Sequence, residues 1–250
     1  MFEEPFRWIE AISTRHSYVR EKLAQGQPVI AVPYNEGALM MGFSPQGGKI
    51  FEIYDRIGMG GLGHPADVEK LRMTLLELAH IEGFNRSEQD VTIGRLLQFG
   101  IAPSLKQNFE EVMRAPYLVQ LLLMEIDQEE QPRFYRLNYD GHWEVFKQGA
   151  VIAGNSRTAE WIEQEIPKIA FSKMSLDEAL RSACKLWEEG RKQMTDVEKE
   201  KSAGPASLKE VFEKWTLESA VLSRVSPGRC LYRAVTSDEI EPIKNSIVVS

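Results

Sequence analysis

Residues 37–72 read GALMMGFSPQGGKIFEIYDRIGMGGLGHPADVEKLR, and their pattern indicates strands followed by a helix. The short apolar runs in and just before this stretch have the length of strands, which we expect at 29–34, 38–42, 50–54 and 57–62. The first two runs are separated by Asn35-Glu36-Gly37, and glycine tolerates the positive φ that a tight hairpin turn demands. Pro65 suits the first turn of a helix, so the last strand leads into a helix over 65–82.

Outward from this stretch, the apolar spacing continues in blocks. It predicts helices at 5–25, 90–113, 156–166 and 208–215, and strands at 117–126, 134–138, 143–147, 150–153, 216–223 and 230–235. A further helix is opened by the capping box Ser175-Leu176-Asp177-Glu178. The run 117–126 is so apolar that we expect it in the centre of a covered sheet. This order predicts the α+β class: a four-layer α-β-β-α sandwich of two stacked antiparallel sheets with an extra N-terminal helix.

The predicted organisation is one domain over residues 1–250. We divide it into an N-terminal segment with its helix at 1–25, the sandwich at 26–235 and a C-terminal tail at 236–250. The tail is expected to hold a short helix at 237–244 and then to run extended. The charge-rich residues 188–214 are interrupted by Ala203-Gly204-Pro205, so we expect a long solvated connection there.

Composition excludes several classes of function. A net charge of −7 without a concentrated basic face argues against nucleic acid as a partner. No apolar run approaches the length of a membrane span, and the acidic, aromatic N-terminus is unlike a signal peptide, so we expect a cytoplasmic protein. The two cysteines, Cys184 and Cys230, form no CxxC motif, and the four histidines lack ligand spacing. We therefore expect no metal and no cofactor.

The quoted stretch, together with APYLVQLLLMEID at 115–127 and the element order, resembles the subunits of proteasome core particles. The resemblance covers residues 5–235 and is specific at three places in the right order. These are the Lys49-Ile50 pair after the hairpin, the strand that ends at Gly63, and the Pro-Tyr-x-Val-Gln-Leu-Leu strand at 116–122.

In that family, active β-type subunits begin with a threonine whose own amine serves as its base, helped by an acid and a lysine. By the resemblance, the threonine position falls on Gln27, the acid position on Phe43 and the lysine on Lys49. An amide is no nucleophile here and a phenyl ring carries no charge. The resemblance therefore implies a subunit with no catalytic residue.

Two features resemble the bacterial α-type subunits of the family. One is the helix at 5–25 ahead of the sandwich, and the other is Tyr54-Asp55-Arg56-Ile57-Gly58. This implies a non-catalytic subunit of a homo-oligomeric α ring that stacks on proteolytic β subunits, gates the entry of unfolded protein substrates and docks a ring-shaped ATPase. The gate residues would be Met1, Phe2, Glu3 and Glu4.

The resemblance also implies a role for Lys49. With the backbone at Gly26 and Gly63, it would line a pocket for the C-terminal carboxylate of the ATPase. A carboxylate that enters a partly dry groove needs a cation and backbone amides. The alternative is a solvated surface lysine, which is the commoner state of this residue type.

Three other functions remain open from the sequence. Residues 58–63 form a GxGxxG pattern between a strand and a helix, with Glu82 placed as a ribose-binding acid, which suits a dinucleotide site. That fold needs a parallel strand directly after the helix, whereas Gly83 begins a turn into another helix. The others are an N-terminal nucleophile hydrolase activated by cleavage before Gln27, Ser17 or another residue, and an inactive scaffold outside proteolysis.

Overall fold

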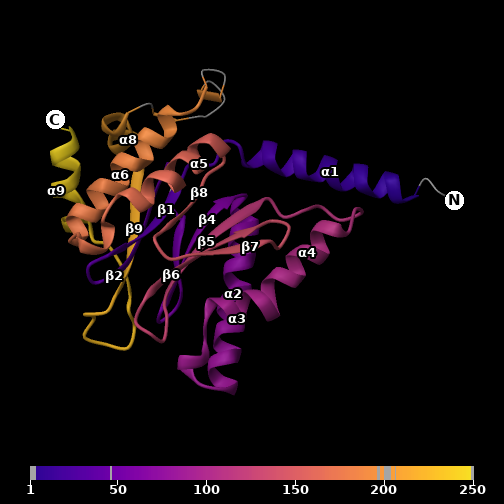
Figure 1. The fold of residues 1–250 in the computed structure, drawn as a ribbon, viewed down its shortest axis with the longest axis horizontal. Helices are drawn as coiled ribbons and strands as arrows, with labels where there is room; N and C mark the ends of the chain where they lie inside the picture. Colours follow the sequence, from indigo (N-terminus) through magenta and orange to yellow (C-terminus); the bar gives the residue numbers. More distant parts are fainter. Residues whose placement is uncertain (1–3, 46, 196–197, 200–203, 206, 249–250) are drawn as a thin grey trace.

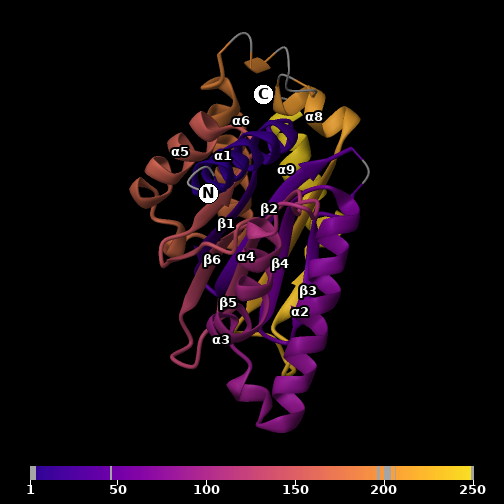
Figure 2. The ribbon, with the colours of Figure 1, turned by 90° about the vertical axis from the view of Figure 1, so that its right-hand side faces the viewer.

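The computed structural model describes residues 4–45, 47–195, 198–199, 204–205 and 207–248. Within them, two five-stranded sheets stack face to face, as Figures 1 and 2 show. The first sheet has the order β10-β9-β2-β1-β8, with β1 Val29–Tyr34, β2 Gly37–Ser44, β8 Ala150–Ile152, β9 Thr216–Ser223 and β10 Tyr232–Ala234. The second runs in chain order, with β3 Ile50–Tyr54, β4 Ile57–Gly63, β5 Val119–Ile126, β6 Pro132–Asn138 and β7 Trp143–Phe146. Neighbouring strands in both sheets are antiparallel.

Helices cover both outer faces, which confirms the four-layer sandwich. The first sheet is covered by α5 Ser156–Glu165, α6 Leu176–Lys192, α8 Leu208–Lys214 and α9 Ser237–Val248. The second is covered by α2 Pro65–Asn85, α3 Ile93–Leu96 and the helical segment that follows, which ends in α4 Ala102–Glu110. The capping box at Ser175 is present: its hydroxyl accepts from the Glu178 amide, and the Glu178 carboxylate accepts from the Ser175 amide. Among the described residues, no helix combines the length and apolarity of a membrane span.

The core lies in three layers, and β2 shows why. Successive side chains of a strand point to opposite faces, so Ala38 and Met40 enter the layer between the sheets, while Leu39 and Phe43 pack under the helices. Every residue of β2 is buried. The strand therefore belongs to the centre of the sandwich, as does β5, whose apolar sequence predicted this position.

Helix α1, Glu4–Leu23, lies across one end of the sandwich (Figure 1). Val19 and Leu23 enter the core between the sheets, whereas the first half of the helix extends beyond the body of the molecule. Arg15, in the second half of the helix, donates to the carbonyl of Asn108 in α4 and to those of Val112 and Arg114 just after α4. The N-terminal helix of the prediction is therefore an integral part of the fold.

The single helix expected at 90–113 is wrong in detail. The segment consists of a 3-10 turn at Glu88–Asp90, then α3, a π-helical segment at Leu97–Ile101 and α4. Thr92 caps α3 with its side chain, so the helix begins there rather than at Asp90. Pro103 has no amide hydrogen for a helical bond, which favours the irregular segment just before α4.

Two expectations for the C-terminal third are also wrong. The tail does not become extended after Lys244, because α9 continues to Val248 and buries Ile243 against the helical layer. The charged connection is not uniformly solvated, since α6 runs on to Lys192 and Met194 and Pro205 are buried. The amide of Leu208 donates to the carboxylate of Glu188, which joins the start of this segment to the start of α8.

Candidate functional site

Lys49 is positioned by the turn between β2 and β3. The Glu218 carboxylate, on β9, accepts hydrogen bonds from the Lys49 and Ile50 amides at 2.9 and 3.3 Å and from the Ser44 hydroxyl at 3.2 Å. The Ser44 hydroxyl accepts in turn from the Gly47 amide. These bonds direct the Lys49 side chain toward the start of β1, where its Nζ donates to the Gln27 carbonyl at 3.2 Å.

The three residues predicted to form a pocket lie together. Lys49, Gly26 and Gly63 line one groove of about 650 Å³. Its other lining residues are Gln25, Gln27, Ser44, Pro45, Gly47, Gly48, Phe51, Gly61, Leu62, Pro65, Val68, Glu69 and Trp215. We call this the Lys49 groove.

Both predicted glycines are required by the geometry of the groove. Gly63 has a φ of +133°, and a Cβ there would lie 2.0 Å from the Leu118 carbonyl oxygen. A Cβ on Gly26 would lie 2.5 Å from the Leu62 side chain. Side chains are therefore excluded at two positions that border the groove. Of the predicted gate residues, Met1, Phe2 and Glu3 lie outside the described residues, and Glu4 begins α1.

The Lys49 amine is a partly dehydrated cation. Burial lowers the pKa of Lys49 to about 8, against the opposing attraction of Glu218. The Glu218 carboxylate is already engaged by backbone amides, and Lys49 forms no ion pair with any carboxylate in the described parts of the chain. A groove with such an amine at its wall has the chemistry to receive an anion.

The two positions that would hold a threonine and an acid in an active β-type subunit are buried and non-acidic. Gln27 is 7% exposed and lies between the end of α1 and the start of β1, with its Nε2 donating to the Gln25 carbonyl. Phe43 is fully buried under the helices, with its ring 4.8 Å from that of Trp187 and 5.2 Å from that of Phe212. Neither side chain supplies a nucleophile or a base beside Lys49.

The family model described as "Proteasome subunit" matches residues 24–200. This chain belongs to the proteasome subunit family. Relatives named "Proteasome subunit alpha" agree along most of their length. That of Actinosynnema mirum is 30% identical over 236 residues, which cover 90% of this chain and 81% of the relative. The relative from Geodermatophilus obscurus is 31% identical over 235 residues, which cover 92% of this chain and 76% of the relative. The relative from Mycolicibacterium vanbaalenii is 30% identical over 239 residues, which cover 94% of this chain and 87% of the relative. The chain is thus a proteasome subunit of the alpha type.

The glycine pattern at 58–63 has a packing role in this proteasome subunit. It lies within β4, whose neighbours β3 and β5 are both antiparallel, so the parallel strand that a dinucleotide fold needs is not there. A Cβ on Gly60 would lie 2.8 Å from the Met40 and Val29 side chains, and one on Gly61 would lie 2.5 Å from Val68. These glycines let β4 approach the first sheet and α2 closely.

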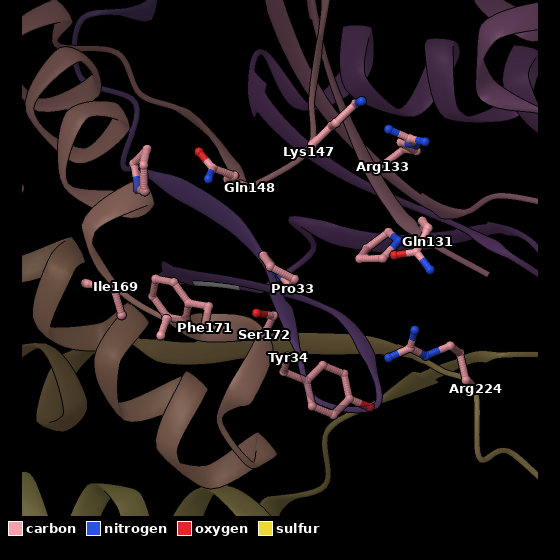
Figure 3. A pocket seen from close by; sticks show the side chains of 13 residues that line it. Pro33, Tyr34, Gln131, Arg133, Lys147, Gln148, Ile169, Phe171, Ser172 and Arg224 are labelled. Carbon is pink, nitrogen blue, oxygen red and sulfur yellow. The ribbon is translucent and has the colours of Figure 1, made fainter. Parts of the chain in front are cut away.

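A second groove of about 520 Å³ lies at the turns between β1 and β2 and between β5 and β6 (Figure 3). Arg133, Lys147 and Arg224 border it. However, Arg224 donates to the carbonyls of Asn35, Glu36 and Glu130, and Arg133 pairs with Asp127 at 2.8 Å. Two of the three cations therefore join turns of the proteasome subunit, which makes the Lys49 groove the better candidate site.

Sequence reasoning missed two residues of the Lys49 groove region, Glu218 and Trp215. They follow Lys49 by more than 160 residues and reach it because β9 pairs with β2. No local motif marks them. The structure also brings ligand atoms of Glu52, Asp55 and Cys230 within 4.8 Å of one another, a grouping that the spacing does not suggest.

Proposed function

We propose that this α-type subunit is non-catalytic and forms the outer ring of a proteasome core, where it gates substrate entry and docks a ring ATPase for intracellular protein degradation. The lack of catalysis is supported by Gln27 and Phe43 and by α1, whose Val19 and Leu23 are part of the core. Cleavage before Gln27 would remove those core residues. Its partners would be copies of itself, proteolytic β subunits, the ATPase and the unfolded proteins that pass through.

The observation that carries the docking proposal is the Lys49 amine at the groove wall. This amine donates to a backbone carbonyl, that of Gln27, and burial already disfavours its charge. An incoming carboxylate would supply the missing counter-ion and form a charge-assisted hydrogen bond, which is about twice as strong as a neutral one. The backbone at Gly26 and Gly63 would border the rest of the tail. Met1 to Glu4 would close the pore.

Lys49→Ala tests this proposal in the particle assembled with its β subunits. We expect degradation stimulated by the ATPase to fall by about 10-fold or more, because the charge-assisted bond is lost. Native mass spectrometry checks that the rings still assemble. Lys147→Ala is the matched control, since it removes an exposed lysine at the other groove. Unchanged stimulation in Lys49→Ala would contradict docking at this groove.

The alternative, a hydrolase activated by processing, makes a different prediction. It requires cleavage before Gln27 or Ser17, and Ser17 lies inside α1 with its hydroxyl donating to the Ser13 carbonyl. The intact mass of the chain after co-expression with a threonine-initiating β subunit separates the two. Retention of α1 and co-purification with that β subunit are expected, and loss of α1 would favour the hydrolase.

A further inference from the structure

Arg191, in the last turn of α6, is a cation buried without a carboxylate in the described parts of the chain. Only 7% of the residue is exposed. Its Nη1 donates to the Pro205 carbonyl, whereas its Nε is buried and finds no acceptor within the described ranges. Because a buried charge is costly without compensation, the contacts around this guanidinium need an explanation.

Two indole rings hold the Arg191 guanidinium. Its central carbon lies 4.7 Å from the centroid of the Trp187 ring and 6.0 Å from that of the Trp215 ring. The two rings meet nearly at right angles, with centroids 6.4 Å apart. Cation–π attraction to aromatic faces is strongest for tryptophan and increases when the pair is shielded from water. Arg191 therefore links a fully buried ring to a part-buried one.

Both rings connect Arg191 to the walls of the Lys49 groove. Trp215 lines the groove itself. Trp187 donates from its Nε1 to the Pro28 carbonyl at 3.1 Å, next to Gln27, whose carbonyl accepts from Lys49. Arg191 also borders a small cavity behind this wall, together with Gly26 and Gln27. Arg191 thus contacts one ring that lines the groove and another that binds the backbone next to Gln27.

Gly204 and Pro205 complete the arrangement. A Cβ on Gly204 would lie 2.4 Å from the Trp215 ring and 3.3 Å from Nη2 of Arg191, so a side chain there would displace one or both. Pro205 is buried and supplies the carbonyl that Arg191 binds. Gly204, within the charged connection, is therefore packed closely against the Trp215 ring.

We propose that Arg191 is a positioning residue for the Lys49 groove: it fixes Trp215 as the apolar wall against which the residues just before a tail's terminal carboxylate pack. The inference rests on the proposed docking function and adds a second element to it. Lys49 would recognise the carboxylate, and Trp215, held by Arg191 and by the backbone at Gly204, would recognise the apolar body of the tail. Arg191 itself does not contact the tail.

The test compares two forms of one probe on the assembled core particle. The probe is a fluorescein-labelled heptapeptide with the C-terminal sequence of the particle's ATPase, prepared as the free acid and as the C-terminal amide. Fluorescence anisotropy gives both dissociation constants. Arg191→Met should weaken both forms about equally, by about 10-fold, because the wall loses its support while Lys49 remains. Lys49→Ala should instead abolish the preference for the acid.

Two further variants keep the test independent of folding defects in Arg191→Met. Gly204→Ala alters no charge and should weaken both peptides in the same way, because its methyl group displaces Trp215. Arg191→Lys retains the cation and should recover part of the affinity. Lys192→Met, the adjacent exposed position, is the matched control and should bind like the wild type.

The outcomes separate the two proposals. If Lys49→Ala keeps the preference for the free acid, docking through Lys49 fails. If Lys49→Ala loses that preference but Arg191→Met and Gly204→Ala bind both peptides like the wild type, docking through Lys49 is supported and the positioning role of Arg191 is wrong. A loss of the acid preference in Arg191→Met would also contradict the proposal, since it would mean that Arg191 contacts the carboxylate directly.

Discussion

At the scale of single residues, the burial of the Lys49 amine is unfavourable for folding. Its amine is partly dehydrated and bonded to a neutral carbonyl, so the folded chain favours the uncharged form more than the unfolded chain does. The unfolded pKa lies near 10.5 and the folded pKa is about 8. Burial of the Lys49 amine therefore lowers the free energy of unfolding by its full amount below pH 8, and this effect disappears as the pH rises from about 8 toward 10.5.

Lys49→Met should therefore stabilise the isolated chain at neutral pH. We expect the free energy of unfolding to rise by about 1 kcal/mol, less than the whole pKa shift implies, because the amine is part-exposed. The gain should vanish as the pH approaches about 10, where lysine loses its charge in both states. Urea unfolding at several pH values measures this. A stability difference that does not change with pH would show that the charge of Lys49 is not responsible.

The same pKa predicts how tail binding depends on pH. Only the protonated amine attracts a carboxylate, so the affinity of the free-acid peptide should fall as the pH rises above the pKa of about 8. Because the bound carboxylate favours the charged amine, the pKa in the complex should be higher than in the free subunit. The amide form of the peptide should show a much weaker dependence. Anisotropy titrations between about pH 7 and 9.5 check this. Parallel curves for the two peptides would rule out Lys49 as the receiving cation.

At the scale of elements, the start of α3 depends on a buried carboxylate from another layer. Glu125 lies on β5, is 4% exposed, and accepts from the Ile93 amide at 2.7 Å and from the Tyr135 hydroxyl at 2.6 Å. Burial raises the pKa of Glu125, in opposition to these hydrogen bonds. The helix predicted over 90–113 therefore begins only at Ile93, where the carboxylate of a strand residue accepts from the first helical amide.

Glu125→Ala should destabilise the chain by about 3 kcal/mol, because it leaves a buried helix amide and a buried hydroxyl without acceptors. Glu125→Gln keeps one acceptor oxygen and should cost about 1 kcal/mol. A raised pKa means that the wild-type carboxyl stabilises most at low pH, so the penalty of Glu125→Gln should shrink as the pH rises above about 4.5. Equal losses for both substitutions would contradict the capping role.

At the scale of the whole molecule, α1 closes one end of the sandwich. Its second half enters the core between the sheets, and its first half extends outward (Figure 1). Val19→Ala should lower the free energy of unfolding by about 2 kcal/mol through lost burial and a cavity. Ile9→Ala, on the exposed half of the same helix, should change it by less than about 0.5 kcal/mol. Equal effects would mean that α1 is not anchored as the structure shows.

The sequence predicted the elements well where the apolar period is regular. The strands at 50–54 and 216–223 lie at their predicted positions, and the first hairpin and the capping box at Ser175 are present. Prediction from the sequence failed where a contact with a residue distant in the chain determines the bounds of a helix or the burial of a segment. The carboxylate of Glu125 helps to set the start of α3, and the rings that hold Arg191 keep part of a charged segment out of water. Glu125 and Trp215 are distant in the chain from the residues they contact, whereas Trp187 lies one helical turn before Arg191 on α6.

By itself, the sequence predicted the sandwich, because the period of its apolar residues marks the helices and strands. Its resemblance to proteasome subunits implied that Gln27 and Phe43 replace the nucleophile and the acid, and that Lys49 is a candidate docking residue. Only the tertiary structure decided that Lys49, Gly26 and Gly63 line one groove, and that Glu218 and Trp215 reach it. The physical reason is the pairing of β2 with β9. It joins residues more than 160 positions apart, and no local pattern encodes such a contact.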